Sequence, residues 1–197
     1  KRTGIRLSIY KQGGVNMRRD AEENKHRIET KAKALFTEFG VENISMKRIS
    51  NELNLGMGTL YRHFEDKSAL CYKLISNDFE MFVTDLNTIS QKEKSNKMIF
   101  IQSIDRFLQF KIEHQALLKC VENSTSKKDF KQTEFYQLLH DYYSNLFNYE
   151  ENEYFITFKV DILLNALTTK NYEFLTKNRK MSNEEFRNAL VQLFYNN

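Results

Sequence analysis

The stretch from Ser45 to Lys67 decides the fold, and it reads SMKRISNELNLGMGTLYRHFEDK. Its apolar spacing predicts two short helices, at about 46–53 and 57–64, that cross at a steep angle. Ser45 is a favourable N-cap for the first of them. Asn54 lies in the turn between them, where the chain needs a positive φ, which asparagine tolerates better than most residues. The stretch therefore predicts two helices joined by a tight turn.

A helix pair joined by so short a turn cannot bury its apolar side alone, and a helix predicted upstream supplies the missing cover. The segment from about Asp20 to Phe39 carries apolar residues at the spacing of one helical face. These residues are Ile28, Ala32, Leu35, Phe36 and Phe39. Gly40 then ends the helix as a left-handed cap. Three helices in this order predict a helix-turn-helix DNA-binding domain at residues 20–66, with its second short helix free to enter a major groove.

The rest of the chain is predicted to be helical as well. Residues 59–197 contain neither glycine nor proline. Tight β-hairpins depend on pairs such as Asn-Gly, whereas helices can be joined through the Asn and Ser clusters found here. We therefore predict an all-α protein with a helical C-terminal domain at residues 67–197. The expected helices run from about Asp66 to Leu86 and over residues 97–112, 115–123, 129–147, 151–177 and 183–195, the last one opened by a capping box of Ser182 and Glu185.

Composition and motifs exclude several classes of protein. No apolar run approaches the roughly 20 residues needed to cross a bilayer, and no export signal is recognisable, so we expect a cytoplasmic protein without a membrane partner. Cys71 and Cys120 lack metal-ligand spacing, and the chain has only four histidines. No nucleophile motif or phosphate-binding glycine loop is present. We expect neither an enzyme nor a bound metal or cofactor.

The net charge of +4 is a weak argument for nucleic-acid binding, because of where the charge lies. Residues 1–16 contain four basic side chains and no acidic one, which accounts for the whole excess. We interpret residues 1–19 as a basic, disordered extension without a clear helical face. It could be an arm for a minor groove. We favour a non-native segment, because Gly13-Gly14 can be encoded by a ribosome-binding sequence two codons before Met17.

Three motifs in the predicted head resemble the tetracycline-repressor (TetR/AcrR) family of bacterial regulators. They are FTEFG at 36–40, ISNEL at 49–53 and GTLYRHF at 58–64, followed by Asp66-Lys67 and Ala69-Leu70. The resemblance covers about residues 28–74. Two positions depart from the family pattern, because Asn54 stands where glycine is usual and Gly56 where Ser or Thr often caps the recognition helix. Both departures are physically tolerable.

The resemblance implies a set of DNA-contact residues. They are Ser45, Lys47, Met57, Gly58, Thr59, Tyr61, Arg62, His63 and Lys67. Met57, Gly58 and Thr59 would face the bases, and Gly58 would let the backbone approach closely. Along the groove edge, Tyr61 and His63 would donate to phosphates and Arg62 would reach either a phosphate or a guanine. Lys67 would bind a phosphate, and Ser45 and Lys47 would hold the DNA from the start of the first short helix. The alternative is that Tyr61 and His63 are ordinary packing residues and that Arg62 and Lys47 are solvated charges.

For the C-terminal domain the resemblance implies effector binding and dimerisation. The expected pocket for a small apolar or aromatic effector comprises Phe82, Phe100, Phe107, Phe110, His114, Phe135, Tyr136, His140 and Tyr143. The expected homodimer interface comprises Phe155, Phe158, Ile162, Ala166, Phe186, Leu190 and Leu193. The alternatives are a phenylalanine-rich core and helix packing within one monomer.

The sequence thus predicts a ligand-responsive homodimeric repressor that binds a palindromic double-stranded DNA operator through the helix at 57–64. The alternative is a TetR-like DNA-binding protein that has a protein partner and no small-molecule effector, in chromosome organisation or cell division. A ligand that shifts the helix starting near Asp66 and releases the operator would distinguish the two functions, since only the repressor requires a ligand response.

Overall fold

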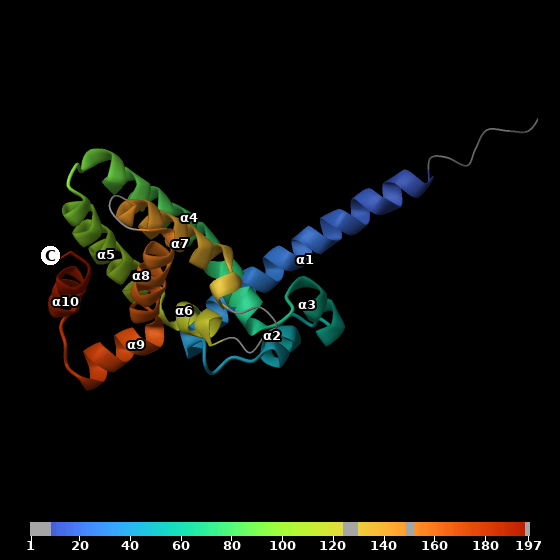
Figure 1. The fold of residues 1–197 in the computed structure, drawn as a ribbon. Coiled ribbons are helices and arrows are strands. Elements are labelled where there is room, and N and C mark those ends of the chain that lie inside the picture. The colour runs from blue at the N-terminus through green and yellow to red at the C-terminus, as the bar shows by residue number, and fades with distance from the viewer. Residues whose placement is uncertain (1–8, 124–129, 149–151, 196–197) are drawn as a thin grey trace, which may run out of the picture. The chain divides into compact units, whose positions relative to one another are not determined.

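The computed structural model describes residues 9–123, 130–148 and 152–195, with side chains from residue 19 onward. Within these ranges the chain is helical and contains no β-strand, which confirms the predicted fold class (Figure 1). The elements are α1 (Ile9–Phe39), α2 (Met46–Glu52), α3 (Met57–His63), α4 (Lys67–Lys92), α5 (Asn96–Glu113), α6 (Gln115–Glu122), the 3-10 turn η1 (Phe130–Gln132), α7 (Glu134–Phe147), α8 (Glu153–Ala166), α9 (Thr169–Glu173), the π-helical turn η2 (Phe174–Asn178) and α10 (Asn183–Tyr195). None of the helices described is long and apolar enough to span a membrane.

The chain forms two compact units, one ending at Leu70 and the other beginning at Cys71. This division lies within α4, four residues beyond the domain boundary predicted at residue 66. Helix α4 therefore contributes its first turn to the N-terminal unit and its remaining turns to the C-terminal unit.

The N-terminal unit is built by α1, α2 and α3 around one small core. Four of the five predicted α1 residues are buried, and Ile28 and Ala32 have no exposed surface. Ile49 of α2 and Leu60 of α3 are equally buried. Phe39 is the exception, because 38% of its surface is exposed and the Arg48 guanidinium lies 4.1 Å from its ring centroid. The predicted three-helix arrangement is therefore confirmed, with Phe39 at its edge.

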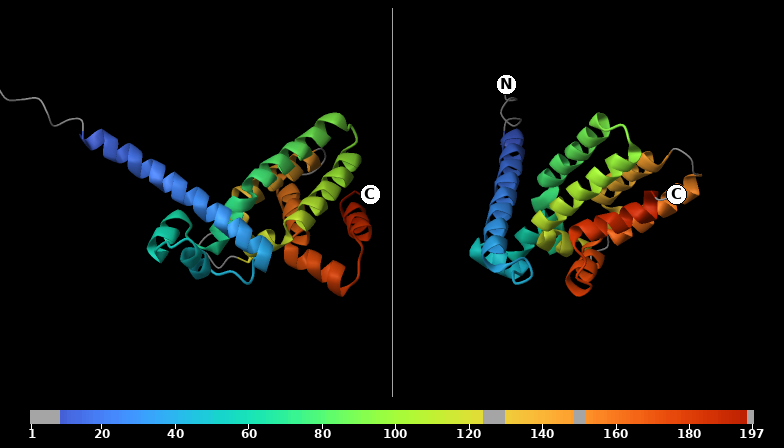
Figure 2. Two further views of the ribbon diagram at one scale, coloured as in Figure 1. Left: turned by 180° about the vertical axis from the view of Figure 1, so that it is seen from behind. Right: turned by 90° about the vertical axis from the view of Figure 1, so that its left-hand side faces the viewer.

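Helix α1 begins at Ile9, so the prediction of a non-helical extension up to residue 19 is wrong for residues 9–19. Figure 2 shows α1 as one continuous helix. Once residues 20–39 have nucleated a helix, each further residue adds a backbone hydrogen bond, and a glycine costs only about 1 kcal/mol. Gly13 and Gly14 therefore do not stop the helix from extending toward the N-terminus. Residues 1–8 of the predicted extension lie outside the described residues.

Gly40 and Asn54 take the left-handed conformation that their positions require. Gly40 has φ +82° directly after α1, and its N–H donates to the Phe36 carbonyl at 3.0 Å. Asn54 has φ +52° in the turn between α2 and α3. Both conformations were predicted from residue type and position alone.

The C-terminal unit packs α5 beside α10, α7 beside α8 and α6 beside α9 (Figures 1 and 2). Aromatic rings join α4 to α7 and α5. The Phe135 ring lies between two rings of α4, at 4.1 Å from Tyr72 and 3.7 Å from Phe79. The Phe82 ring stacks on Phe110 at 4.8 Å. Such pairs stabilise a fold by about 0.5–1.5 kcal/mol each beyond the area they bury.

The helix predicted over residues 151–177 is broken in the structure into α8, α9 and η2. Asn152 caps α8, and its side chain accepts from the Phe155 N–H at 2.9 Å. Helix α8 ends at Ala166, and α9 begins at Thr169. The Thr169 N–H donates to Glu122 Oε2 at 2.6 Å. Because a distant carboxylate takes this N–H, the chain starts a new helix here. Residue 151 lies outside the described residues.

Two other predicted helix starts can be compared with the structure. Helix α7 begins at Glu134, after η1 and its N-cap Thr133, rather than at residue 129, which lies outside the described residues. Thr133 accepts from the Tyr136 N–H at 3.3 Å, so the side chain fixes the later start. The capping box of α10 is confirmed, because the Ser182 N–H donates to Glu185 and the Glu185 N–H donates to Ser182 Oγ.

A buried ion pair joins α5, α6 and the start of α9. The Lys111 side chain has no exposed surface, and its ammonium lies 3.4 Å from Glu122 Oε1 and 2.9 Å from Thr169 Oγ1. Thr169 Oγ1 also donates to Glu122 Oε1 at 2.9 Å. Burial lowers the pKa of Lys111, and the Glu122 carboxylate opposes that shift. The Glu122 carboxylate thus pairs with the buried Lys111 ammonium and also accepts a backbone hydrogen bond from the first residue of α9.

We expect Glu122→Ala to lower the free energy of unfolding by about 3–5 kcal/mol, because it leaves the Lys111 ammonium buried and unpaired. The measurement is urea unfolding followed by circular dichroism. Glu80→Ala, at an exposed carboxylate of α4, is the control and should change stability by less than about 0.5 kcal/mol. Equal effects of the two substitutions would contradict the structural role of the ion pair.

Candidate nucleic-acid interface

Helix α3 is held to the N-terminal unit through one side and leaves the other open. Leu60 is its only buried residue, and Phe64, which follows directly, is 4% exposed. On the open side Gly58, Tyr61 and Arg62 are exposed. The seven-residue helix therefore presents an accessible surface that contains three of the predicted DNA-contact residues.

The turn before α3 is closed by two hydrogen bonds between Ser50 and Leu55. The Leu55 N–H donates to the Ser50 carbonyl at 3.0 Å, and Ser50 Oγ donates to the Leu55 carbonyl at 2.5 Å. Ser50 is 2% exposed. Sequence reasoning did not single out Ser50. The position of Ser50, one turn before the left-handed Asn54, could have indicated this hydrogen bond, because Ser side chains commonly bond to nearby backbone groups.

Gly58 has no structural reason to be glycine. Its φ is not positive, and a Cβ placed on it would meet no atom within 4 Å. Gly56, the N-cap of α3, is equally open. A glycine within a helix is less favourable than alanine by about 0.5–1 kcal/mol. A missing side chain on the exposed side of α3 therefore suits close approach by another molecule.

Two predicted base-contact residues are already joined to each other. Arg62 Nη2 donates to Thr59 Oγ1 at 2.9 Å, one turn apart on α3. The contact limits the positions open to the long arginine side chain and aligns it along the helix. Met57, Thr59 and His63 are half-buried, which places them at the margins of the open side.

The start of α2 supplies a second group of predicted contacts. Ser45 Oγ accepts from the Arg48 N–H at 3.2 Å, so it caps α2 as predicted. The Lys47 side chain is exposed and makes no hydrogen bond or ion pair within the described part of the chain. Lys47 is therefore the predicted phosphate-binding residue with the fewest competing contacts.

Lys67 differs from the prediction. Asp66 caps α4 as expected, with Oδ1 accepting from the Ala69 N–H at 2.7 Å. The Lys67 ammonium, however, donates to the Val41 carbonyl and lies 5.7 Å from the Phe36 ring centroid. The long side chain reaches back to the segment after α1 because the Val41 carbonyl and the Phe36 ring lie within its reach. Lys67 thus stabilises the N-terminal unit, in addition to the phosphate contact predicted for it.

The structure brings only part of the predicted effector pocket together. A cavity of about 30 Å³ in the C-terminal unit is lined by Phe107, Phe110, Phe135 and Tyr136. Phe82, Phe100 and Tyr143 lie in the packed core and do not line this cavity. His114 and His140 are half-buried and also lie outside it. Their polar atoms contact Asp78 at 3.7 Å and Ser144 at 3.4 Å, respectively.

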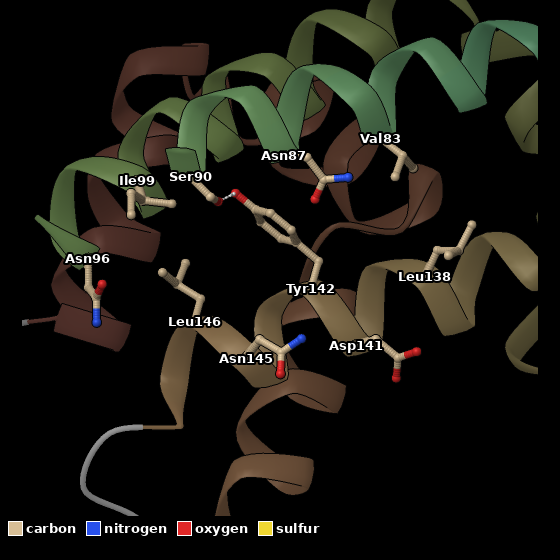
Figure 3. A pocket seen from close by; sticks show the side chains of 10 residues that line it. All are labelled: Val83, Asn87, Ser90, Asn96, Ile99, Leu138, Asp141, Tyr142, Asn145 and Leu146. Atoms are coloured by element: carbon tan, nitrogen blue, oxygen red, sulfur yellow. Dashed lines mark hydrogen bonds between the residues drawn. The ribbon is translucent and has the colours of Figure 1, made fainter. Parts of the chain in front are cut away.

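A larger cleft opens between α4, α5 and α7, and it contains none of the predicted effector residues (Figure 3). Its volume is about 440 Å³. The Tyr142 side chain crosses it from α7, and its hydroxyl lies 2.9 Å from Ser90 Oγ on α4. Asn87, Asn96 and Asn145 lie around it. The cleft is thus a surface feature with a mixed polar and apolar lining, apart from the core cavity.

The predicted dimer residues divide into two groups. Phe155, Phe158 and Ile162 of α8 and Leu193 of α10 are exposed, by 48%, 62%, 48% and 77%. Ala166 is half-buried against the core. Phe186 and Leu190 are only 2% and 3% exposed, so their assignment to an outer surface is wrong. They face the monomer core because α10 packs beside α5 with that side.

Comparison with known proteins agrees with this geometry. Residues 28–71 match the family model of bacterial regulatory proteins of the tetR family. An HTH-type transcriptional regulator of Staphylococcus aureus (strain MRSA252) is 48% identical over 178 residues, covering 90% of this chain and 96% of that protein.

Solved structures with low sequence identity share the fold. A TetR-family transcriptional regulator from Syntrophomonas wolfei has a TM-score of 0.60 at 18% identity, covering 88% of this chain and 93% of that chain. The transcriptional regulator FadR from Bacillus subtilis, solved in complex with stearoyl-CoA, has a TM-score of 0.61 at 12% identity, covering 86% and 96%. At such identities the likeness concerns the fold alone.

We expect Gly58→Ala to raise the free energy of unfolding by about 0.5 kcal/mol, because alanine restricts the unfolded chain and meets no atom in the folded one. The same substitution should weaken DNA binding, because the new methyl group occupies the surface that approaches the bases. Urea unfolding and gel-shift titration measure the two effects.

Gly40→Ala is the contrasting variant. It should lower stability by about 1 kcal/mol or more, since alanine is strained at φ +82°. Unchanged DNA affinity of Gly58→Ala would show that the open side of α3 does not meet DNA.

Proposed function

Because the chain belongs to the tetR family of bacterial regulatory proteins, we propose that it is a ligand-responsive homodimeric repressor of transcription. The family consists of DNA-binding transcriptional regulators and not of enzymes. In our proposal α3 enters the major groove of a palindromic operator. The observation that carries the DNA-reading role is the open side of α3, where Gly58 has no role in folding.

We assign base reading to Thr59 and Arg62 and phosphate binding to Lys47. A threonine hydroxyl or methyl group can contact a base edge, and an arginine can bond to guanine in two places. What supports this division is that Thr59 and Arg62 already lie side by side, whereas the Lys47 ammonium is exposed at the start of α2. The hydrogen bond between Thr59 and Arg62 would keep the arginine side chain in a position from which it can enter the major groove.

The homodimer is supported by an apolar stripe on the outer side of α8. Tyr154, Phe155, Phe158 and Ile162 are all exposed there, Tyr154 by 90%. The opposite side of α8 faces the core with Ile156, Val160, Leu163 and Leu164. A helix that is apolar on both sides is usually covered by a partner. A twofold mate on this stripe would set two copies of α3 about 34–36 Å apart, one turn of DNA.

The ligand response needs two states with different ligand affinities. Helix α4 supports such coupling, because one continuous helix starts beside the DNA-reading elements of the N-terminal unit and continues into the C-terminal unit. A ligand that favours one position of α4 would lower operator affinity by the same factor by which operator binding lowers ligand affinity.

Thr59→Ala and Lys47→Gln should weaken DNA binding in different ways. The measurement is gel-shift titration at several salt concentrations, with an operator obtained by in vitro selection from random DNA and with a scrambled duplex. Thr59→Ala should reduce the preference for the operator, because it removes a base contact. Lys47→Gln should weaken binding to both duplexes and lower the salt slope by about one.

Equal loss on both duplexes for Thr59→Ala would contradict base reading. A salt slope unchanged by Lys47→Gln would contradict its phosphate contact. Mapping of bound sites in the genome separates the two functions predicted from the sequence. Many scattered sites that no ligand releases would favour the protein-partner alternative over the repressor.

Phe158→Glu should turn the dimer into a monomer, because it puts a charge into the apolar stripe. Light scattering measures the mass. Affinity for the palindrome should then fall by about 100-fold, since the second half-site is no longer bound by the same molecule. Met81→Glu is the matched control, because Met81 is 60% exposed and Phe158 is 62% exposed. A dimer that survives Phe158→Glu and dissociates with Met81→Glu would contradict the assigned interface.

A further inference from the structure

The core cavity of the C-terminal unit lies directly behind a surface cleft. The cavity, of about 30 Å³, is almost wholly apolar in its lining. The cleft, of about 370 Å³, lies over α7, α8 and the start of α9. Five residues line both: Glu122, Phe130, Tyr136, Leu164 and Thr168. A single layer of side chains therefore separates the apolar cavity from the solvent-filled cleft.

The layer between them includes one aromatic side chain that is only half-buried. Phe130 is half-buried and lies in the three-residue turn η1, whereas Tyr136 and Leu164 are buried on α7 and α8. The Phe130 and Tyr136 rings meet edge to face at 6.0 Å. Rotation of Phe130 away from Tyr136 would join cavity and cleft. The cleft alone has a volume in the range of ligand sites, about 300–1,000 Å³.

The cleft also carries a defined charge. Lys131 and Lys170 are exposed residues of its lining. Among the described residues of that lining Glu122 is the one acidic side chain, and its carboxylate already accepts from Lys111 and Thr169. The mouth therefore carries the exposed ammonium of Lys170 next to an apolar interior, and the charge of Glu122 is already matched by Lys111. This combination selects for a negative charge at the mouth and an apolar group inside.

We propose that cleft and cavity together bind a small amphiphilic anion, with its apolar or aromatic body between Phe130, Tyr136 and Leu164 and its anionic group beside Lys170. This proposal rests on the proposed ligand-responsive function and gives the chemical class of the effector. It extends the predicted apolar or aromatic effector by an anionic head group. It also separates the effector site from the cleft of Figure 3, where Asp141 is the one charged side chain among the described lining residues.

The test compares three probes that share one body and differ in charge: phenylbutyrate, phenylbutanol and phenylbutylamine. Binding to the full-length, DNA-free protein is measured by calorimetric titration at fixed ionic strength. Phenylbutyrate should bind about 5-fold more tightly than the alcohol, and the amine should bind most weakly. Tightest binding by the amine, or no binding of phenylbutyrate at millimolar concentration, overturns the proposal.

Three variants locate the site. Lys170→Gln should weaken phenylbutyrate binding about 3-fold and leave phenylbutanol binding unchanged. Lys97→Gln, at an exposed lysine of α5 outside the cleft, is the charge-matched control and should change neither. Asn145→Ala reports on the cleft of Figure 3. Equal effects of the two lysine variants, or a loss confined to Asn145→Ala, overturn the assigned site.

A substitution in the cavity tests whether the apolar body enters it. Leu118→Phe, on the cavity wall, should weaken all three probes by 5-fold or more by filling the space. Urea unfolding verifies that Leu118→Phe is folded. If this variant does not fold, the proposal is tested by Lys170→Gln. Full-strength binding by a folded Leu118→Phe protein overturns the part of the proposal that uses the cavity.

A separate gel-shift titration distinguishes this proposal from the proposed function. If phenylbutyrate binds with the expected variant pattern and does not release the operator, the site is supported and the ligand-responsive role fails. If the protein binds its operator and no probe binds, the site is wrong and DNA binding stands.

Discussion

The paired hydrogen bonds between Ser50 and Leu55 determine where α3 lies, and the DNA-reading role that we propose for α3 depends on them. They join α2 to the residue just before α3, and Asn54 can close the turn only in its left-handed conformation. Leu60 then reaches the core, and the opposite side of α3 remains open. A seven-residue helix has too few backbone hydrogen bonds to persist alone, so its position comes from this turn and from Leu60.

The N-terminal unit was predictable because its signals are local. Gly40 and Asn54 report their own backbone conformations, and Ser45 and Asp66 cap the helices that follow them. What local pattern cannot give is the direction of long side chains. Lys67 turns to the Val41 carbonyl rather than outward, and Arg62 bonds to Thr59. The start of α1 was missed for a related reason, since helix growth from an existing nucleus outweighs the cost of two glycines.

The C-terminal unit was predictable as helical but not in its packing. Periodicity shows that a helix has an apolar side, and it does not show what covers that side. Phe186 and Phe158 satisfy the same pattern, yet the first is buried on α5 and the second is exposed. The break between α8 and α9 depends on Glu122, 47 residues earlier in the chain. No window of sequence around Thr169 contains that information.

The buried pair of Lys111 and Glu122 constrains how this protein can evolve. Its two members lie on different helices, and each is tolerated in the interior because the other is present. A substitution that removes only one of the two charges produces a protein with an unpaired ion in its core. Replacement by apolar residues therefore requires both positions to change together, and drift at one site depends on the state of the other. Lineages of this regulator should consequently keep the two residues as an inherited unit or lack both.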